Sequence, residues 1–124
     1  MHYRIVFSEE ADHLLCITDG SVNDAEEYIA WGLATLKKVQ ETGHKKILYD
    51  NRTFRLNLTP LDTVLFAKRY EELNVVQLGL RMAVLPNPKN PEISRLIETT
   101  LTNRSASYKT FATQAEALAW LLKN

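Results

Sequence analysis

The sequence is poor in the residue types that most often build metal, redox and phosphate-binding sites. It has one cysteine, three histidines and four glycines among 124 residues. One cysteine cannot form a disulfide within the chain, which fits a reducing compartment. The histidines at positions 2, 13 and 44 lack the spacing of metal ligands. No glycine-rich phosphate loop and no Gly-x-Ser-x-Gly nucleophile elbow occurs. We therefore predict no cofactor and no metal site, and an enzyme is the least favoured class of function.

The chain also lacks an excess of charge and a long apolar run. Fifteen Lys and Arg balance fifteen Asp and Glu, so the formal net charge is zero. Proteins held on a phosphate backbone usually have a basic excess, which disfavours nucleic-acid binding. No run approaches the roughly 20 apolar residues that span a bilayer, and the N-terminus does not resemble a signal peptide. We expect a cytoplasmic protein without membrane insertion, folded as a single domain over residues 1–124.

Short apolar runs alternate with amphipathic stretches along the chain. The first two runs are close enough for an antiparallel hairpin, and helical stretches separate all later runs, which favours parallel pairing through crossovers. The expected strands are 3–7, 13–18, 45–49, 79–85 and 107–111, and the expected helices begin near Asn23, Thr59, Asn90 and Thr113. The order β-β-α-β-α-β-α-β-α predicts an α/β fold: a single, mostly parallel five-stranded sheet with an antiparallel first strand and about four helices.

The helix pattern also predicts which residues face inward. For the first helix the apolar spacing selects Ala25, Ile29, Leu33, Leu36 and Val39, and leaves Trp31 off the main stripe. For the second helix Thr59 is the expected N-cap, with Pro60 at the first helical position and Asp62 at the third. A loop is expected over residues 53–58 before this cap. The expected inner face of the second helix is Leu61, Val64, Leu65, Lys68 and Leu73.

Alternation along the strands divides the sheet residues between two faces. One face is expected to carry Leu15, Ile17, Ile47, Tyr49, Leu80, Met82 and Val84, and the other Leu14, Cys16, Leu48, Arg81, Ala83 and Leu85. If all crossovers run in one direction, their helices cover one face and leave the second uncovered. An uncovered apolar face predicts a homodimer. The alternative is that a helix covers it.

The candidate site is the edge of the sheet where the parallel strands have their carboxyl ends. In open α/β sheets ligands bind beyond these ends. This edge is expected to collect five polar residues, Asp50, Asn51, Arg52, Arg55 and Asn87. The two arginines, with the free amides near Thr59, form a possible anion site. The alternative is that Arg52 pairs with Asp50 and that Thr59 only caps its helix.

Three segments resemble the STAS-like domains and, among them, the SpoIIAA-like (STAS/SEC14-type) family. They are residues 46–52 (KILYDNR), residues 80–85 (LRMAVL), and the strand YKTF at 108–111 followed by EALAWL at 116–121. The resemblance implies the α/β fold described above. It also implies non-enzymatic switches that are phosphorylated on a Ser following an Asp at a strand-to-helix junction. Here Asp50 is followed by Asn51-Arg52-Thr53, so that Ser is missing, and Thr53 or Thr59 could serve as a phosphoacceptor only as a displaced substitute. The alternative is that these two residues have ordinary loop and cap roles.

The hypothesis that follows is a non-catalytic, STAS-like regulatory module that binds an unknown protein partner or small ligand at the carboxyl edge of its sheet. The alternative is a carrier for an anionic or amphipathic, lipid-like small molecule.

Overall fold

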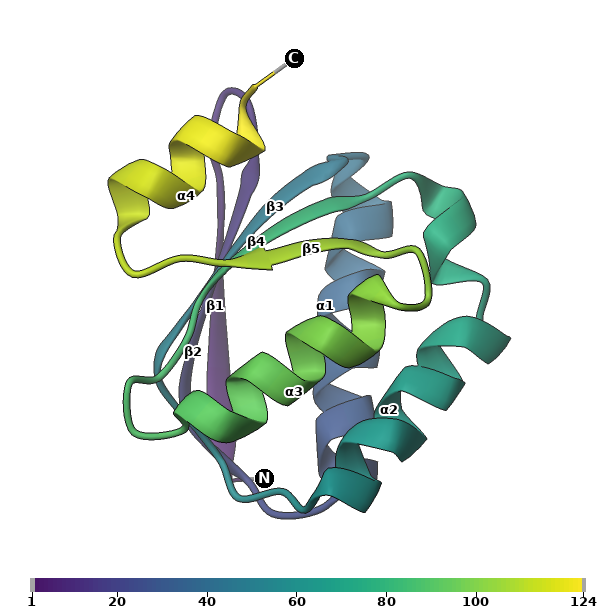
Figure 1. Ribbon diagram of the computed structural model, residues 1–124. Coiled ribbons are helices and arrows are strands. Elements are labelled where there is room, and N and C mark those ends of the chain that lie inside the picture. Colours follow the sequence, from purple (N-terminus) through teal and green to yellow (C-terminus); the bar gives the residue numbers. More distant parts are fainter. Residues whose placement is uncertain (1, 124) are drawn as a thin grey trace.

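A five-stranded sheet with helices on both faces forms the molecule, in a computed structural model that describes residues 2–123 (Figure 1). The strands are β1 (Tyr3–Glu9), β2 (Leu14–Val22), β3 (Lys46–Leu56), β4 (Arg81–Leu85) and β5 (Ser107–Thr110). The helices are α1 (Ala25–Thr42), α2 (Pro60–Glu72), α3 (Pro91–Thr102) and α4 (Gln114–Leu121), with a short 3-10 turn, η1 (Val75–Leu78), after α2. Within these residues no helix is long and apolar enough to cross a membrane.

The strands lie in the sheet in their order along the chain, β1-β2-β3-β4-β5. β1 is antiparallel to β2, and the pairs β2–β3, β3–β4 and β4–β5 are parallel. This arrangement confirms the predicted fold class. Because every crossover steps to the next strand in the same direction, α1, α2 and α3 lie together on one face (Figure 1). The short α4 folds back against the other face.

Each face of the sheet has its own hydrophobic core. The larger core joins the sheet to α1, α2 and α3 and contains Leu14, Cys16, Ile47, Tyr49 and Met82. The smaller core joins β3 and β4 to α4 and contains Leu48, Ala83, Leu85, Ala117 and Leu121. A helix therefore covers the β3–β4 part of the second face, which is the alternative to a wholly uncovered dimer surface. Val6 of β1 remains 45% exposed.

The predicted facing of β2 was wrong by one residue. Leu14 pairs with Ile47 and Cys16 with Tyr49, so Leu14 and Cys16 lie on the face covered by α1, α2 and α3. Leu15 packs in the smaller core instead. The run at 14–17 is apolar at every position, so it has no alternation to set the phase, and only pairing with β3 decides it.

The expected loop over residues 53–58 is largely strand. β3 continues to Leu56, and its pairing with β2 shifts between Ile17–Asp50 and Asp19–Thr53. One residue of β2 therefore stands opposite two residues of β3, Asn51 and Arg52, which is a β-bulge. The bulge changes the phase of the strand, because Tyr49 is buried before it and Phe54 and Leu56 are buried after it.

The predicted start of α2 is confirmed, but its inner face was wrong. Thr59 caps the helix and forms a reciprocal capping box with Asp62. The residues buried on α2 are Thr63 and Ala67, and Phe66 and Tyr70 pack against the core from partly buried positions. The expected inner residues Leu61, Val64, Leu65 and Leu73 are exposed. Two apolar faces compete on this helix, and the aromatic face packs inward.

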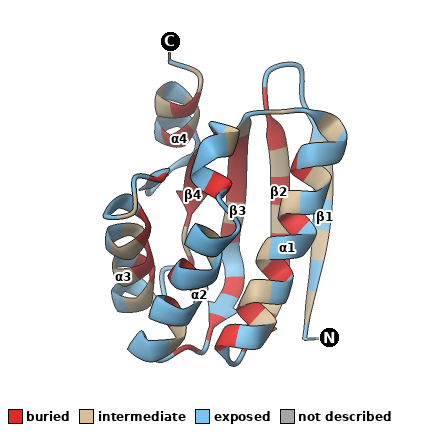
Figure 2. Ribbon diagram, turned by 90° about the vertical axis from the view of Figure 1, so that its right-hand side faces the viewer, coloured by how far each residue is buried: buried red, intermediate tan, exposed pale blue. Residues whose placement is uncertain are grey.

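The facing of α1 also differs from the prediction. The helix begins at Ala25 with Asp24 as its N-cap, one residue later than expected. Trp31, placed off the stripe by the sequence, is buried at 5% exposure, whereas Leu33 is 40% exposed. Figure 2 shows the exposed outer sides of α1 and α2 lying next to each other over the buried strands. These rotations bring aromatic side chains between the helices and the sheet.

Candidate functional site

A cavity of about 70 Å³ lies between α1, α2 and the sheet. Its walls come from α1, β3, α2, β4, α3, β5 and the segment from Leu73 to Leu80. The lining residues are mostly apolar and aromatic: Tyr28, Ile29, Trp31, Gly32, Leu33, Thr35, Leu36, Tyr49, Asn51, Phe66, Arg69, Tyr70, Leu73, Val75, Leu80, Met82, Val84, Leu101 and Tyr108. Small-molecule sites in proteins have this character, a concave apolar surface with a few polar groups.

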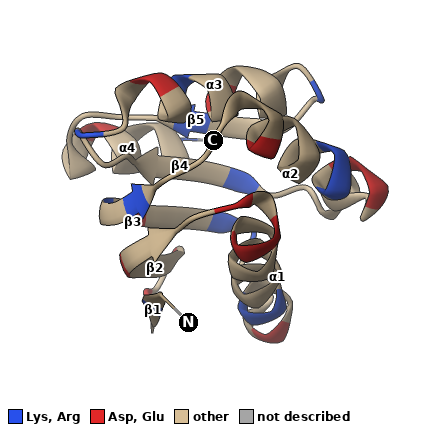
Figure 3. Ribbon diagram, turned by 90° about the horizontal axis from the view of Figure 1, so that it is seen from below, with Lys and Arg blue, Asp and Glu red and all other residues tan. Residues whose placement is uncertain are grey.

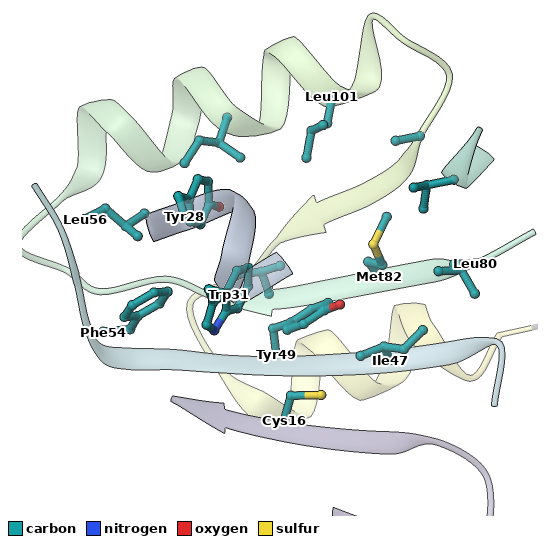
Figure 4. Packing of buried hydrophobic residues seen from close by; sticks show 14 of the residues in the cluster. Cys16, Tyr28, Trp31, Ile47, Tyr49, Phe54, Leu56, Leu80, Met82 and Leu101 are labelled. Carbon is teal, nitrogen blue, oxygen red and sulfur yellow. The ribbon is translucent and has the colours of Figure 1, made fainter. Parts of the chain in front are cut away.

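An aromatic stack forms the wall nearest α1 (Figure 4). The Tyr28 ring lies between Trp31, at 5.3 Å between centroids, and Phe66, at 4.1 Å. Trp31 also meets the Tyr49 ring on the sheet at 5.5 Å. The indole Nε1 of Trp31 donates a hydrogen bond of 3.0 Å to Thr18 Oγ1, which fixes the ring. Rigid aromatic walls of this kind hold flat apolar groups well.

Four of the five tyrosines in the chain line the cavity, each from a different element. Burial raises the pKa of Tyr70 to about 12, and it raises the pKa values of Tyr28, Tyr49 and Tyr108 further above their ordinary value. These hydroxyls therefore stay neutral at physiological pH. The Thr35 hydroxyl donates to Gly32 O at 2.9 Å and lies 3.4 Å from the Tyr49 hydroxyl.

Asn51 is the buried polar residue of β3 at the bulge. It follows Tyr49 on the helix-covered side of β3, is only 7% exposed, and borders both the main cavity and a smaller one beside α3. Its Oδ1 atom is buried and has no hydrogen-bond partner among residues 2–123. Leaving a buried acceptor unpaired costs roughly 1–3 kcal/mol, and such exceptions in native structures call for an explanation.

Asp50 and Arg52, the neighbours of Asn51, form an ion pair with each other. Arg52 Nε and Nη2 donate to the two carboxylate oxygens of Asp50 at 2.9 and 2.8 Å. The hydrogen bond from Arg52 is the main cause that holds the pKa of Asp50 below its ordinary value. Asp50 pairs with Ile17 and Leu85, on the side of the sheet opposite Tyr49. Arg55, further along β3, is exposed.

The other residues named from the sequence make local structural bonds. Asn87 is buried, donates from Nδ2 to Phe54 O at 3.3 Å and accepts from the Lys89 amide at 2.9 Å. Thr53 donates to the Thr18 carbonyl and to the Asp19 carboxylate. The Thr59 hydroxyl accepts from the Asp62 amide at 3.2 Å.

The structure thus places Asp50, Asn51 and Arg52 together in the sheet but divides them between its faces. The cavity was not predicted from the sequence. Two residues in the sequence could have indicated the cavity. Trp31 lies off the predicted apolar stripe of α1, and Gly32 is a residue type that is uncommon inside a helix. In the described part of the chain no group of three or more His, Cys, Asp or Glu residues is arranged to hold a metal ion.

Comparison with known proteins identifies the fold. No protein-family model matches the chain, and no curated protein matches its sequence. An anti-sigma factor antagonist from Mycobacterium paratuberculosis is similar in structure, with a TM-score of 0.61 and 13% identity over 98% of this chain and 95% of that one. The anti-sigma factor antagonist SpoIIAA in its unphosphorylated form gives a TM-score of 0.53 and 14% identity over 98% and 100%.

A third similar structure is an uncharacterised protein of the DUF3478 family from Shewanella loihica PV-4, which is described as having a SpoIIAA-like fold. It gives a TM-score of 0.51 and 20% identity over 96% of this chain and 93% of that one. The resemblance carried by the three sequence segments is therefore confirmed at the level of the fold: this chain has the SpoIIAA-like α/β fold over nearly its whole length.

Proposed function

We propose that this protein is a non-catalytic binding module that takes a small, largely apolar molecule into the cavity between α1, α2 and the sheet. The observation that carries the proposal is the buried, unpaired Oδ1 of Asn51 at a cavity lined mostly by apolar and aromatic residues. A ligand that donates a hydrogen bond to this atom would remove its desolvation penalty.

The size of the cavity limits the ligand. An engineered cavity of about 150 Å³ holds benzene in another protein, so about 70 Å³ takes a ring only if the side chains at the mouth move outward. Phe66 and Leu73, which line the mouth from α2 and its C-terminal end, are not fully buried. A single ring or a short chain with one polar group fits these dimensions better than a long lipid.

The lining chemistry supports binding rather than catalysis. The residues around the cavity include no Asp, Glu, His or Cys, which are the usual sources of general acids, bases and nucleophiles. The tyrosines are the titratable groups with hydroxyls at the cavity, and burial keeps them protonated. These groups offer hydrogen bonds without a reactive centre.

Titration of isotope-labelled protein with phenol, followed by NMR, tests the proposal. Phenol carries one ring and one hydrogen-bond donor, and it should shift the resonances of Gly32, Tyr70 and Asn51. Asn51→Leu should lose most of this response, because Leu has a similar volume but no acceptor. Arg52→Gln is the matched control, since it changes the adjacent residue on the other side of the sheet. Absence of any response at the cavity in the wild-type protein would refute the proposal.

A protein partner at the carboxyl edge is the second candidate. Its support is the structural similarity to two anti-sigma factor antagonists, proteins whose descriptions name a protein target. Arg55 is exposed and has no ion pair within residues 2–123. Replacing Arg52 and Arg55 together by Ala should weaken a partner captured by affinity purification, whereas Asn51→Leu should not. Unchanged capture by the double variant would count against this edge.

Homodimerisation through the part of the second sheet face near Val6 and Ile17 also remains a prediction. A monomer at high protein concentration in analytical ultracentrifugation would contradict the homodimer prediction.

A further inference from the structure

Arg69 of α2 is the one charged residue among those that line the cavity. Its side chain is exposed, and it takes part in no ion pair within the described residues. It lies in the last turn of α2, one position before Tyr70 and four before Leu73, which also line the cavity. A cation without a partner therefore stands beside the mouth of an apolar cavity. The basic segment of α2 is visible in Figure 3.

Exposed apolar side chains are concentrated on the elements that carry the cavity. Six of the seven large hydrophobic residues that are exposed in the described chain belong to α1, α2 and the segment after α2: Leu33, Leu61, Val64, Leu65, Leu73 and Val76. Leu33 and Leu73 also line the cavity. Scattered exposed apolar residues are normal, but a group on neighbouring elements marks a contact surface. Leu33 and Leu73 are the two members of this group that lie beside the single lining cation in the cavity wall.

We infer, on the basis of the proposed function, that the natural ligand is a small amphipathic anion whose apolar body enters the cavity and whose anionic group pairs with Arg69. Charge complementarity supplies the argument, because the cavity wall contributes one positive charge and no negative charge. A guanidinium holds a carboxylate through two parallel hydrogen bonds. The exposed side chains of Leu33 and Leu73 offer apolar contacts to the part of the ligand that the small cavity leaves outside.

Arg69 also suits a purely structural role, because a cation in the last turn of a helix interacts favourably with the helix dipole. If this is its only role, replacing Arg69 should change the stability of the fold and should affect charged and neutral ligands equally. The ligand-binding role predicts an effect confined to anions. The two roles therefore separate when a charged probe is compared with a neutral probe of the same shape.

4-Hydroxybenzoate and 4-hydroxybenzamide form such a pair, since both carry one ring, a phenolic hydroxyl that can donate to Asn51 and one planar polar group, and only 4-hydroxybenzoate is an anion at pH 7. NMR titration of the wild-type protein should give a dissociation constant for 4-hydroxybenzoate about tenfold lower than that for 4-hydroxybenzamide, the size expected for one charge-assisted hydrogen-bonded pair. Arg69→Gln should remove this preference and leave binding of 4-hydroxybenzamide unchanged. Lys68→Gln, at the neighbouring exposed position, should keep the preference. Added salt should reduce it.

Equal binding of the two probes by the wild-type protein would overturn the inference while leaving the proposed cavity site intact. An equal loss of both probes in Arg69→Gln would overturn it as well, because the side chain would then act only through packing. Binding of neither probe at the cavity would overturn both the inference and the proposed function.

Discussion

Gly32 of α1 and Phe66 of α2 approach each other so closely that a Cβ atom on Gly32 would lie 3.1 Å from Cε1 of the Phe66 ring. Both residues line the cavity, so this contact is part of its wall. A glycine inside a helix is less favourable than alanine by about 1 kcal/mol. The glycine therefore gives up helix stability and leaves space for the aromatic ring.

Gly32→Ala should narrow the cavity and weaken phenol binding while changing stability little. The methyl group gains up to about 1 kcal/mol of helix propensity, and the displaced Phe66 ring offsets part of it. Urea denaturation should show a gain below about 1 kcal/mol. Ala34→Gly, at an exposed position of the same helix, calibrates propensity alone and should cost about 1 kcal/mol. Undiminished phenol binding by Gly32→Ala would show that the mouth does not limit entry.

The buried tyrosines should make the protein sensitive to alkali. Their pKa values are raised above 10.0 by burial in the folded chain, whereas the unfolded chain releases these protons near pH 10. Deprotonation therefore favours the unfolded state, so these tyrosines should lower the free energy of unfolding as the pH rises above 10. The buried Cys16 thiol, whose pKa burial raises from 9.0 to about 12, should begin the decline near pH 9. One such group contributes at most about 1.4 kcal/mol per pH unit. Urea denaturation between pH 7 and pH 11 measures the fall.

Tyr70→Phe provides the control for this alkaline effect. Because the pKa of Tyr70 is raised to about 12, removing its hydroxyl should make the decline above pH 10 less steep. An identical slope in the variant would mean that Tyr70 is accessible to hydroxide in the folded protein.

The pair between Asp50 and Arg52 should control the titration of Asp50. Arg52→Ala should raise the pKa of Asp50 toward its ordinary value, since the hydrogen bond from Arg52 is the main cause of its depression. Because the pKa of Asp50 is lower in the folded chain than its ordinary value of 3.8, the ionised carboxylate stabilises the fold above pH 3.8. This stabilisation is lost as the pH falls through the folded-state pKa. Because Arg52 is exposed, the stability change should stay below about 1 kcal/mol. NMR titration of the Asp50 carboxyl measures the pKa, and Arg55→Ala should leave it unchanged.

Thr59 should act as a cap for α2. Thr59→Ala removes the acceptor for the Asp62 amide and should lower the free energy of unfolding by about 1 kcal/mol. Thr59→Ser keeps the hydroxyl and should retain most of that stability. Chemical denaturation of both variants distinguishes them. Equal losses in Ala and Ser would indicate that the methyl group, rather than the cap, matters.

Phosphorylation of Thr53 or Thr59 stays a prediction. The surroundings of both hydroxyls disfavour it. Each hydroxyl already donates to a carboxylate, that of Asp19 or that of Asp62. A phosphate at either position would place a second negative charge beside that carboxylate. Incubation of the folded protein with a threonine kinase, followed by mass spectrometry, should therefore find little phosphate on Thr53 or Thr59.

The local chemistry of the chain determined the order of its elements. Thr59, Pro60 and Asp62 define the start of α2 through contacts within four residues, so the sequence was sufficient to place it. The turn between the first two strands and the alternation of strands with helices likewise predicted the hairpin and the parallel crossovers. These features depend on neighbours along the chain.

The facing of the elements depended on tertiary structure. The run at 14–17 is apolar throughout, so pairing with β3 chose its phase. On α2 two apolar faces were available, and packing of Phe66 and Tyr70 against the core left Leu61 and Leu65 exposed. Neither choice is encoded in periodicity alone, because periodicity reports that a face is apolar without saying what lies against it.

The candidate site shows the same division. The sequence by itself identified the stretch from Asp50 to Arg52 as polar at the end of a buried strand and predicted the fold around it. Only the tertiary structure decided that Asn51 is buried beneath the helices with an unpaired acceptor, while Asp50 and Arg52 pair with each other on the opposite side. Register between strands fixes the direction of each side chain, and register is set by contacts between segments far apart in the sequence.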